Sequence, residues 1–471
     1  IVTTGAQTYN DAVVLTANAT LSSTGAGAIT FAKTVDGGFG LTVNTAGLTT
    51  FNGVVGATRL ASLTTDAPGT TDINGGSIAT TGAQTYNDAV VLGANTTLTS
   101  NGAGAITFAK TVDAQSSGIQ SLAVNTSGTT KFTGVVGATP LASLTTDAGG
   151  STDINGGSVT TTGVQTYNDP VTLTANTVLT STGSGASGNI TFASSLDGGF
   201  SLTVNTAGTT AFDGNVGGSP ITSLTTDAAG TTDINAASVT TSGAQIYNDA
   251  VVLTANATLT STGAGAITFA KTVDAQTSGG EALTVNTSGV TTFDGAVGTT
   301  PLSSLTTDAG GSTVVNGGSV TTTGAQTFGD SVSLTGAPTL LTGTTMTFGS
   351  ILDSTLALTV TGNGVFDGPV SLASLNVSGT SDINGGSVTT AGAQTYAGAV
   401  TLTADDVLTG TTIEFDSTLG GNHTLTVTGN GVFDGGVNIG SLGVSGTSAL
   451  NGGSITTAGT RGRSLRAAWG A

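Results

Sequence analysis

The sequence of 471 residues has no cysteine, one histidine, one methionine and one tryptophan. The absence of cysteine excludes disulfides and thiolate metal sites. The one histidine, His423, lies in a late and shortened copy of a repeat, so we expect neither a histidine-based triad nor a histidine metal cluster. The stability of the fold must therefore come from packing and backbone hydrogen bonds.

Charge is also scarce, and it is mostly of one sign. Only 7% of the residues are charged, and 27 acids against 8 bases give a net charge of -19. Such a chain repels phosphate backbones and anionic lipid headgroups, so we expect no nucleic-acid partner and no membrane surface as partner. No apolar run reaches the length of a membrane-spanning helix, which predicts no membrane insertion. No basic start followed by an apolar stretch opens the chain, so we expect a segment of a longer protein.

A block of about eighty residues recurs along nearly the whole chain. Its marker is GAQTYND, found at 5–11 and 82–88, with variants at 163–169, 243–249, 324–330 and 392–398. A faithful repeat of this kind produces an elongated protein that displays the same surface many times, and each unit packs against its neighbour. We therefore predict one elongated repeat domain over residues 1–460.

Each repeat consists of short runs rich in β-branched residues, bounded by Gly, Asn or Asp. In the fourth copy they include VVLTAN at 251–256, AITFAK at 266–271 and ALTVNT at 282–287. Such runs are typical of strands between turns, and no helical periodicity persists for three turns. The pattern predicts an all-β fold, either a β-solenoid or an array of β-sandwiches.

The spacing of landmarks favours the solenoid, a parallel β-helix. Successive repeats, measured between Ile73, Ile154, Ile234, Val315, Ile383 and Leu450, are 81, 80, 81, 68 and 67 residues long. The shortening after about residue 326 falls in four separate places between strands. This predicts four coils of about twenty residues in each repeat of about 80 residues. Some twenty-four coils, stacked roughly 4.8 Å apart, would form a single rod on the order of 110 Å long.

The segment 461–471 breaks the repeat and holds the one tryptophan, Trp469. A capping or anchoring tail is one interpretation. The prediction favoured here is a non-repeat tail that is disordered, or that derives from cloning or a shifted reading frame.

Recurring acids and asparagines are the first candidates for chemistry. One set of aspartates lies in SLTTDA and another in TDIN or SDIN, and paired carboxylates of this kind can hydrolyse glycosides. Because Val314 and Ala449 replace the second aspartate without other change, we interpret both sets as turn residues that cap backbone amides. The asparagines of LTVNT and of INGG are predicted to shape turns and to pair with the next coil. The four sets are Asp66, Asp147, Asp227 and Asp308; Asp72, Asp153, Asp233 and Asp382; Asn44, Asn125, Asn205 and Asn286; and Asn74, Asn155, Asn235 and Asn316.

The remaining candidates are weaker. The nonapeptide that binds calcium between coils is absent, so no dedicated calcium site is expected. Lys33, Lys110 and Lys271 share one position that Ser194 occupies in the third copy, while Arg59 and Lys131 are isolated, and all five are interpreted as solvated charges. Threonine ladders can bind ice, but here threonine is spread over several strands, where strand propensity also explains it. We predict no catalytic, cofactor-binding or metal-binding residues.

The strings GAQTYND, AITFAKTVD, LTVNTAGTT, SLTTDAGG and INGGSVTT resemble the repeats of giant bacterial surface proteins of the filamentous haemagglutinin and autotransporter-adhesin kind. The resemblance covers residues 1 to about 460. It implies a right-handed parallel β-helix, export through an outer-membrane pore, and an extracellular or cell-surface location. The secretion domain and the β-barrel of that family are not in this sequence.

These observations lead to a functional hypothesis. The chain is expected to be a non-enzymatic stalk of a secreted adhesin, which projects a binding region toward a host cell, a neighbouring cell, a glycan or a matrix component. The alternative is an extracellular filament or biofilm matrix protein that associates end to end through exposed strand edges. A polysaccharide-active enzyme and an ice-binding protein are the remaining alternatives.

Overall fold

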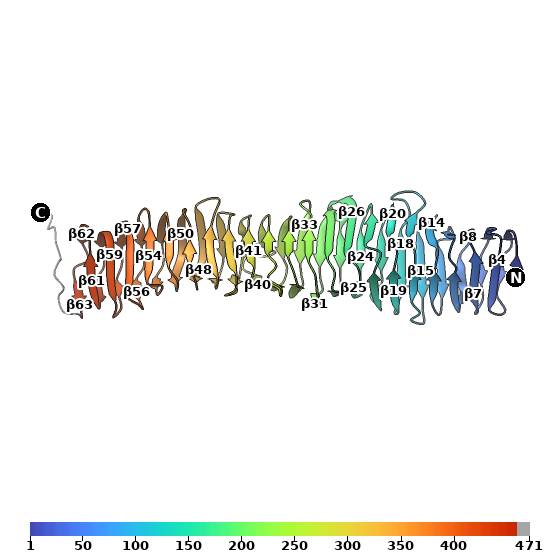
Figure 1. Ribbon diagram of the computed structural model, residues 1–471, viewed down its shortest axis with the longest axis horizontal. Helices are drawn as coiled ribbons and strands as arrows, with labels where there is room; N and C mark the ends of the chain where they lie inside the picture. The colour runs from blue at the N-terminus through green and yellow to red at the C-terminus, as the bar shows by residue number, and fades with distance from the viewer. Residues whose placement is uncertain (459–471) are drawn as a thin grey trace. The chain divides into compact units, whose positions relative to one another are not determined.

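The computed structural model describes residues 1–458; the predicted tail at 461–471 lies outside them. The chain forms two compact units, divided between Thr241 and Ser242, and each is considered by itself. Both are built from parallel strands, and the described residues contain one short helical turn, η1 (Gly185–Gly188) (Figure 1). The predicted all-β parallel β-solenoid is therefore confirmed, with about 22 turns in total. Within residues 1–458 no helix is both long and apolar enough to cross a bilayer.

In the longer repeats each turn of the solenoid contributes three strands, and a strand pairs in parallel with the third strand after it. In unit 1, Gln84 lies beside Ile106, which in turn lies beside Thr130, so one turn takes about 22 residues. The second repeat shows the full set of strands: β13 (Gln84–Tyr86), β14 (Ala89–Leu92), β15 (Thr96–Ser100), β16 (Ile106–Phe108), β17 (Val112–Ala114), β18 (Leu122–Thr126), β19 (Thr129–Phe132), β20 (Val136–Leu141), β21 (Leu144–Thr146), β22 (Ser151–Ile154) and β23 (Ser158–Thr161).

This set of eleven strands is consistent with the predicted count of about four coils in each repeat of about 80 residues. At three strands per turn, a repeat is one strand short of four turns, and the marker strand moves to another face in each repeat. β2 (Gln7–Tyr9), β13 and β24 (Gln165–Tyr167) accordingly stand in three different ladders of unit 1. A ladder takes every third strand along the chain, and a repeat has eleven strand positions. Because eleven is not a multiple of three, a ladder contains all eleven positions before the same one recurs. The prediction of four coils per repeat came from the four shortened places between strands; over the chain it gave some twenty-four coils, against about 22 in the structure.

The shortened repeats of unit 2 lose residues at the corners and keep their strands, as predicted. Residues that form two strands with a loop between them in the longer repeats form one continuous strand here, with a register shift at the former corner. The continuous strands are β48 (Thr339–Phe348), β50 (Ala357–Phe366), β57 (Asp406–Phe415) and β59 (Thr424–Phe433).

The interior is a set of ladders of like side chains. Inward and outward residues alternate along each strand, and the inward positions are almost completely buried. In each repeat three aromatic rings stack on successive turns, as Tyr86, Phe108 and Phe132 do with ring centroids 5.3 Å apart. Such offset stacking adds to the free energy gained from burying the rings.

The corners explain the recurrent glycines. A Cβ atom on Gly75 would lie 2.0 Å from the carbonyl oxygen of Gly53 on the preceding turn, and one on Gly156 would lie 1.9 Å from that of Gly134. The INGG corner therefore favours glycine, because backbone rests directly on backbone, although Ala236 occupies this position in one copy.

The glutamine and tyrosine of the marker form a buried polar pair. The amide nitrogen of Gln84 donates to the carbonyl of Thr99 in β15, two strands later, at 2.9 Å, and its oxygen accepts from the Tyr86 hydroxyl at 2.9 Å. In the fifth repeat Phe328 replaces the tyrosine, and the Gln326 side-chain oxygen has no partner among the described residues. The tyrosine thus serves as the donor that a buried glutamine requires.

This exception supplies a prediction. Phe328→Tyr should stabilise unit 2 by about 1 kcal/mol because it restores a buried hydrogen bond, whereas Tyr396→Phe should cost about 1–3 kcal/mol because Gln394 loses its donor. Denaturant unfolding followed by circular dichroism measures both changes. If both variants shifted stability in the same direction, the pairing would not be the cause.

Candidate functional site

The first predicted set of acids does cap backbone amides. Asp66 accepts from the amide of Thr45 on the preceding turn at 2.7 Å, and Asp147 accepts from that of Thr126 at 2.9 Å. Asp227 and Asp308 repeat this contact at 3.0 and 3.1 Å. A further set that sequence reasoning missed caps an amide of the following turn, each at 2.8 Å: Asp36, Asp113, Asp197 and Asp274.

The second predicted set was wrongly placed in turns. Asp72, Asp153 and Asp233 lie within β11 (Thr70–Ile73), β22 and β33 (Thr231–Ile234), and Asp382 lies within β53 (Ser381–Ile383). They occupy outward strand positions, where alternation with the buried residues of the strand places them. The two predicted aspartate sets therefore have different roles and do not recur as a catalytic pair.

One of these strand acids corrects the prediction for Lys131. The Lys131 ammonium lies 3.7 Å from the Asp153 carboxylate one turn later, so this lysine is not isolated. Half-exposed pairs of this kind contribute little to stability. With its side-chain amide oriented to accept, Asn101 contacts the Arg59 guanidinium at 3.0 Å, so Arg59 also has a neighbour.

The asparagines divide in a similar way. The INGG asparagines follow a strand and bond to a neighbouring turn, as predicted: Asn74 donates to Asn52 at 2.8 Å and Asn316 to Asp294 at 2.5 Å, Asn235 donates to Asp213, and Asn155 accepts from Thr174. The LTVNT asparagines instead lie inside strands, so the turn prediction for them was wrong. They belong to β7 (Gly40–Thr45), β18, β29 (Leu202–Ala207) and β40 (Ala282–Thr287).

Sequence reasoning missed a buried carboxylate in the marker itself. Asp88 is 2% exposed, and its carboxylate accepts from the hydroxyls of Thr65 at 2.7 Å and of Thr71 at 2.8 Å. Asp169 and Asp330 make the same pair of contacts with threonines of the preceding turn. We call this arrangement the aspartate clasp. In the sequence, the aspartate of GAQTYND follows the threonines of SLTTDA and of the next strand, TTDI or STDI, at a fixed distance in successive repeats.

The clasp holds its carboxylate without a cation. Burial raises the pKa of Asp88, Asp169 and Asp330 above the ordinary value of 3.8, and the threonine hydroxyls oppose this by a smaller amount. A nearby aspartate of the capping set raises each pKa further. A buried acid of this kind is a common feature of active sites, but here it recurs in successive repeats with the same structural contacts.

A second buried acid appears once. Asp406 is 1% exposed, and neither carboxylate oxygen makes a hydrogen bond within residues 1–458. Burial raises its pKa to about 6, against smaller lowering effects of the Gly386 amide and of His423. At the corresponding place Thr96 and Thr177 donate a hydroxyl to the carbonyl two residues earlier, each at 2.9 Å.

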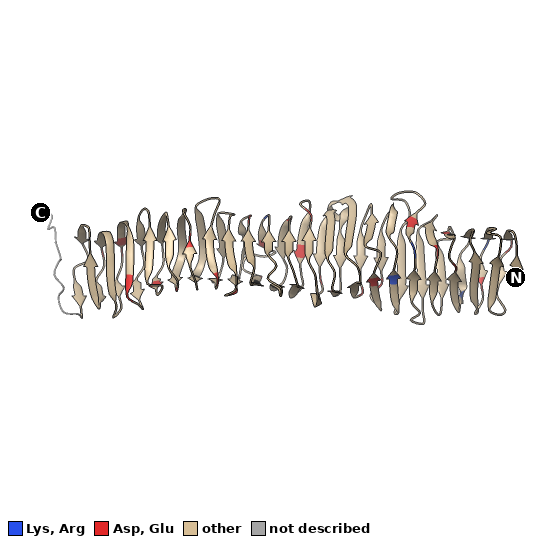
Figure 2. Cartoon of the chain, viewed as in Figure 1, with Lys and Arg blue, Asp and Glu red and all other residues tan. Residues whose placement is uncertain are grey.

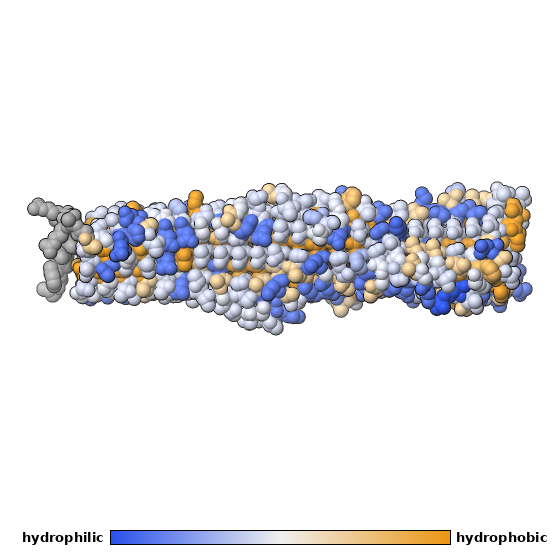
Figure 3. Space-filling view, turned by 90° about the horizontal axis from the view of Figure 1, so that it is seen from below, coloured by the Kyte–Doolittle hydropathy of each residue, from blue (hydrophilic) through white to orange (hydrophobic). Residues whose placement is uncertain are grey.

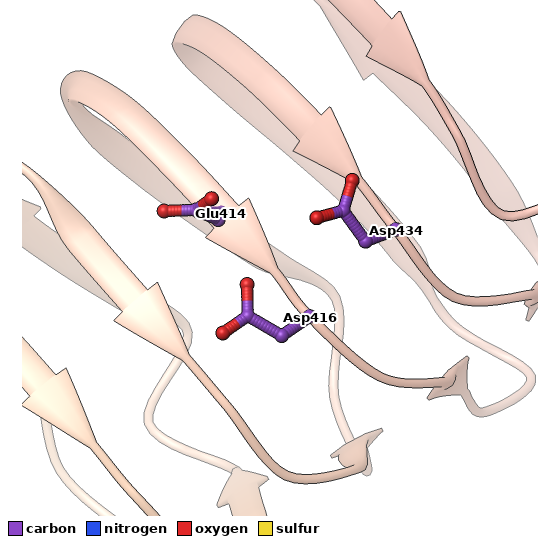
Figure 4. A group of neighbouring side chains, drawn as sticks. All are labelled: Glu414, Asp416 and Asp434. Carbon is purple, nitrogen blue, oxygen red and sulfur yellow. The ribbon is translucent and has the colours of Figure 1, made fainter.

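One acidic cluster could hold a cation. The carboxylates of Glu414, Asp416 and Asp434 lie on neighbouring coils, with oxygens within 4.8 Å of one another (Figure 4). Carboxylates suit Ca²⁺ or Mg²⁺, yet Ca²⁺ takes six to eight oxygens, and Asp434 already accepts from Asn451 at 2.7 Å. The signal in the sequence was Glu414 at an outward position that holds threonine in earlier copies. His423 lies apart from this cluster, 3.6 Å from Asp405.

The outward threonines are more ordered than the sequence suggested. In unit 1 a single ladder aligns Thr20, Thr42, Thr64, Thr85 and Thr107 on successive turns, followed by Lys131 and Asp153. The row of threonines stops after five turns, because the next strands of the ladder have Lys131 and Asp153 at the outward position. It does not form the uninterrupted face that ice binding needs.

Comparison with known proteins adds no relative: no family model, curated protein or solved structure matches this sequence. The resemblance to haemagglutinin-type repeats stays a prediction. Any functional conclusion therefore rests on the residues described above.

The aspartate clasp predicts an unusual pH dependence. A pKa that is higher in the folded than in the unfolded state adds stability that is complete below the ordinary value of 3.8 and is lost as the pH rises through the raised value. Replacing Asp88, Asp169 and Asp330 together by Asn should raise the thermal midpoint at pH 7 and flatten its rise between pH 7 and pH 4. Asp11→Asn is the matched control, since Asp11 has the same place in the marker but is exposed. An unchanged slope in the triple variant would contradict the prediction.

Asp406 gives a separate prediction. Asp406→Thr should stabilise unit 2 by about 1–3 kcal/mol at pH 8, because it replaces a buried acid that lacks hydrogen bonds by a hydroxyl that can donate to Ala404. The gain should shrink below pH 6, where the carboxyl takes up its proton. Urea unfolding at pH 5 and at pH 8 measures the difference, and an equal gain at both values would speak against it.

Proposed function

We propose that the chain is a non-enzymatic stalk segment of an exported bacterial surface adhesin, which projects a binding region away from the cell. The observation that carries the proposal is the use of its polar side chains. The capping acids, the clasp acids and the INGG asparagines all bond one turn to the next, in copy after copy. Residues that an enzyme would gather at one place are here distributed along the repeats.

The distribution of charge supports the same proposal. Acidic residues are spread along the coils of each unit in the view of Figure 2. Polysaccharide-active enzymes instead need a matched pair of acids at a set distance in one cleft. The group Glu414, Asp416 and Asp434 offers acids alone and is open to solvent at two of its three members.

The apolar surface supports a role without a wide docking face. In unit 2, rows of polar side chains flank a narrow apolar line (Figure 3). Large exposed apolar residues are mostly separated from one another along the sequence, as Val178, Leu340 and Val407 are.

Surface location and export are part of the proposal. They rest on the resemblance of the repeats, on the absence of cysteine and on the low content of charge. Structures held by backbone hydrogen bonds between successive turns can form one turn at a time as a chain emerges.

A display experiment tests the stalk. The chain is placed between a cell-surface anchor and a small antibody-binding domain, and capture of antibody-coated beads through the surface polymer layer is measured. Deleting residues 82–162 removes one whole repeat and joins Thr81 to Gly163 within the marker, so the stacking continues. The deletion should shorten unit 1 by roughly 18 Å, at about 4.8 Å per turn, and should reduce bead capture while binding of soluble antibody stays the same.

Two outcomes would overturn the proposal. Bead capture that does not depend on this segment would remove the projecting role. Release of sugars from a panel of bacterial and host polysaccharides by the purified chain would show an enzyme. Concentration-dependent filaments in electron microscopy would favour the matrix alternative.

A further inference from the structure

Three asparagines at equivalent corners stand in the triplet Asn-x-Thr. They are Asn18, Asn95 and Asn256, directly before β4 (Ala19–Ser23), β15 and β37 (Ala257–Ser261). This triplet is the acceptor that asparagine glycosyltransferases read, where the amide nitrogen takes the sugar and the hydroxyl at the third position assists. All three asparagines are exposed.

In each of these asparagines the side-chain oxygen accepts a hydrogen bond from the backbone. The oxygen of Asn18 accepts from the amide of Gly40 at 2.9 Å, that of Asn95 from Ser121 at 3.0 Å, and that of Asn256 from Ala282 at 2.9 Å. In each case the donor belongs to the following turn. The side-chain nitrogens of these three residues make no hydrogen bond within the described residues.

The sixth repeat shows that the nitrogen is dispensable. There Asp405 occupies the same corner, and its oxygen accepts from the Thr424 amide at 2.7 Å. A carboxylate has no N–H to offer, so this contact between turns needs only the oxygen. An asparagine that carries a sugar on its nitrogen keeps its carbonyl oxygen and can therefore keep the contact.

The hydroxyls of the triplets are also accessible. Thr20, Thr97 and Thr258 occupy outward strand positions, and their hydroxyls make no hydrogen bond within residues 1–458. Asn125 and Asn286 have the same triplet pattern but lie inside β18 and β40, where neighbouring strands flank them on both sides. The triplet also occurs at Asn189, Asn376 and Asn422, outside the corner shared by Asn18, Asn95 and Asn256.

We propose that Asn18, Asn95 and Asn256 are attachment sites for N-linked sugar on the folded solenoid. In the transfer, a bond forms between the amide nitrogen and the anomeric carbon of an activated sugar. The bond between that carbon and its phosphate oxygen breaks, the phosphate leaves with the electron pair, and the nitrogen loses one proton. The co-reactant is a sugar diphosphate ester, either a nucleotide sugar or a lipid-linked one.

Asn176 is the internal control. It stands at the same corner and accepts from the Ser201 amide at 3.0 Å, but Val178 occupies the position of the acceptor hydroxyl. The structure at the asparagine is thus the same and the triplet is missing.

The folded chain is incubated with a soluble asparagine glucosyltransferase and UDP-glucose, and glycopeptides are sequenced by mass spectrometry. We expect one hexose at each of Asn18, Asn95 and Asn256 and none at Asn176. Val178→Thr should add Asn176 to the modified sites. Asn95→Asp should abolish modification at that site alone while the thermal midpoint, which depends on the retained oxygen, stays within the error of the measurement.

Failure of the folded chain to be modified at these sites, while the urea-unfolded chain is modified under the same assay, would overturn the proposal. So would a fall in thermal midpoint on modification, since the bond to the next turn is expected to persist. The display experiment on the unmodified chain is independent of both outcomes.

Discussion

The hydrogen bonds between successive turns are the interaction on which the structure depends. Paired strands lie roughly 17 to 26 residues apart in the sequence, so each turn is incomplete without its neighbours and no distant segment is needed to complete it. The side-chain chemistry of the sequence serves this contact. Asparagine and aspartate supply donors and acceptors at the corners, where the regular backbone pairing stops, and glutamine bonds within the interior. Glycine is common where two backbones meet.

Buried polar groups in such a fold must be satisfied locally, because a narrow interior leaves no room for rearrangement. Gln84 with Tyr86 and Asp88 with its two threonines are complete within neighbouring turns. Gln326 and Asp406 mark the places where one member of such a set has changed and the other has not. Both lie in unit 2, and buried hydroxyls without a partner among the described residues also occur in unit 1, at Thr130 and Thr210.

The sequence predicted the class of fold, the positions of the strands and the places of shortening, because alternation and turn residues are local signals. It also predicted about four turns per repeat, but not that a repeat has eleven strands and so falls one strand short of four turns. The capping role of Asp66 followed from its place before glycine or alanine, and the strand position of Asp72 was missed because its neighbour Asn74 does begin a turn. The Asp88 clasp could not be found without the structure, since its threonines lie 17 and 23 residues away.

A repeat has eleven strands and a turn has three, so equivalent strands of successive repeats lie on different faces. This affects where substitutions and added repeats place their side chains. A substitution that spreads through all copies by recombination between repeats will wind around the solenoid, one face further in each copy. Only copies three repeats apart present the same substitution on the same side within one ladder. Gain of a single repeat moves the equivalent strands beyond it by one face, whereas gain of three returns them to the same ladder.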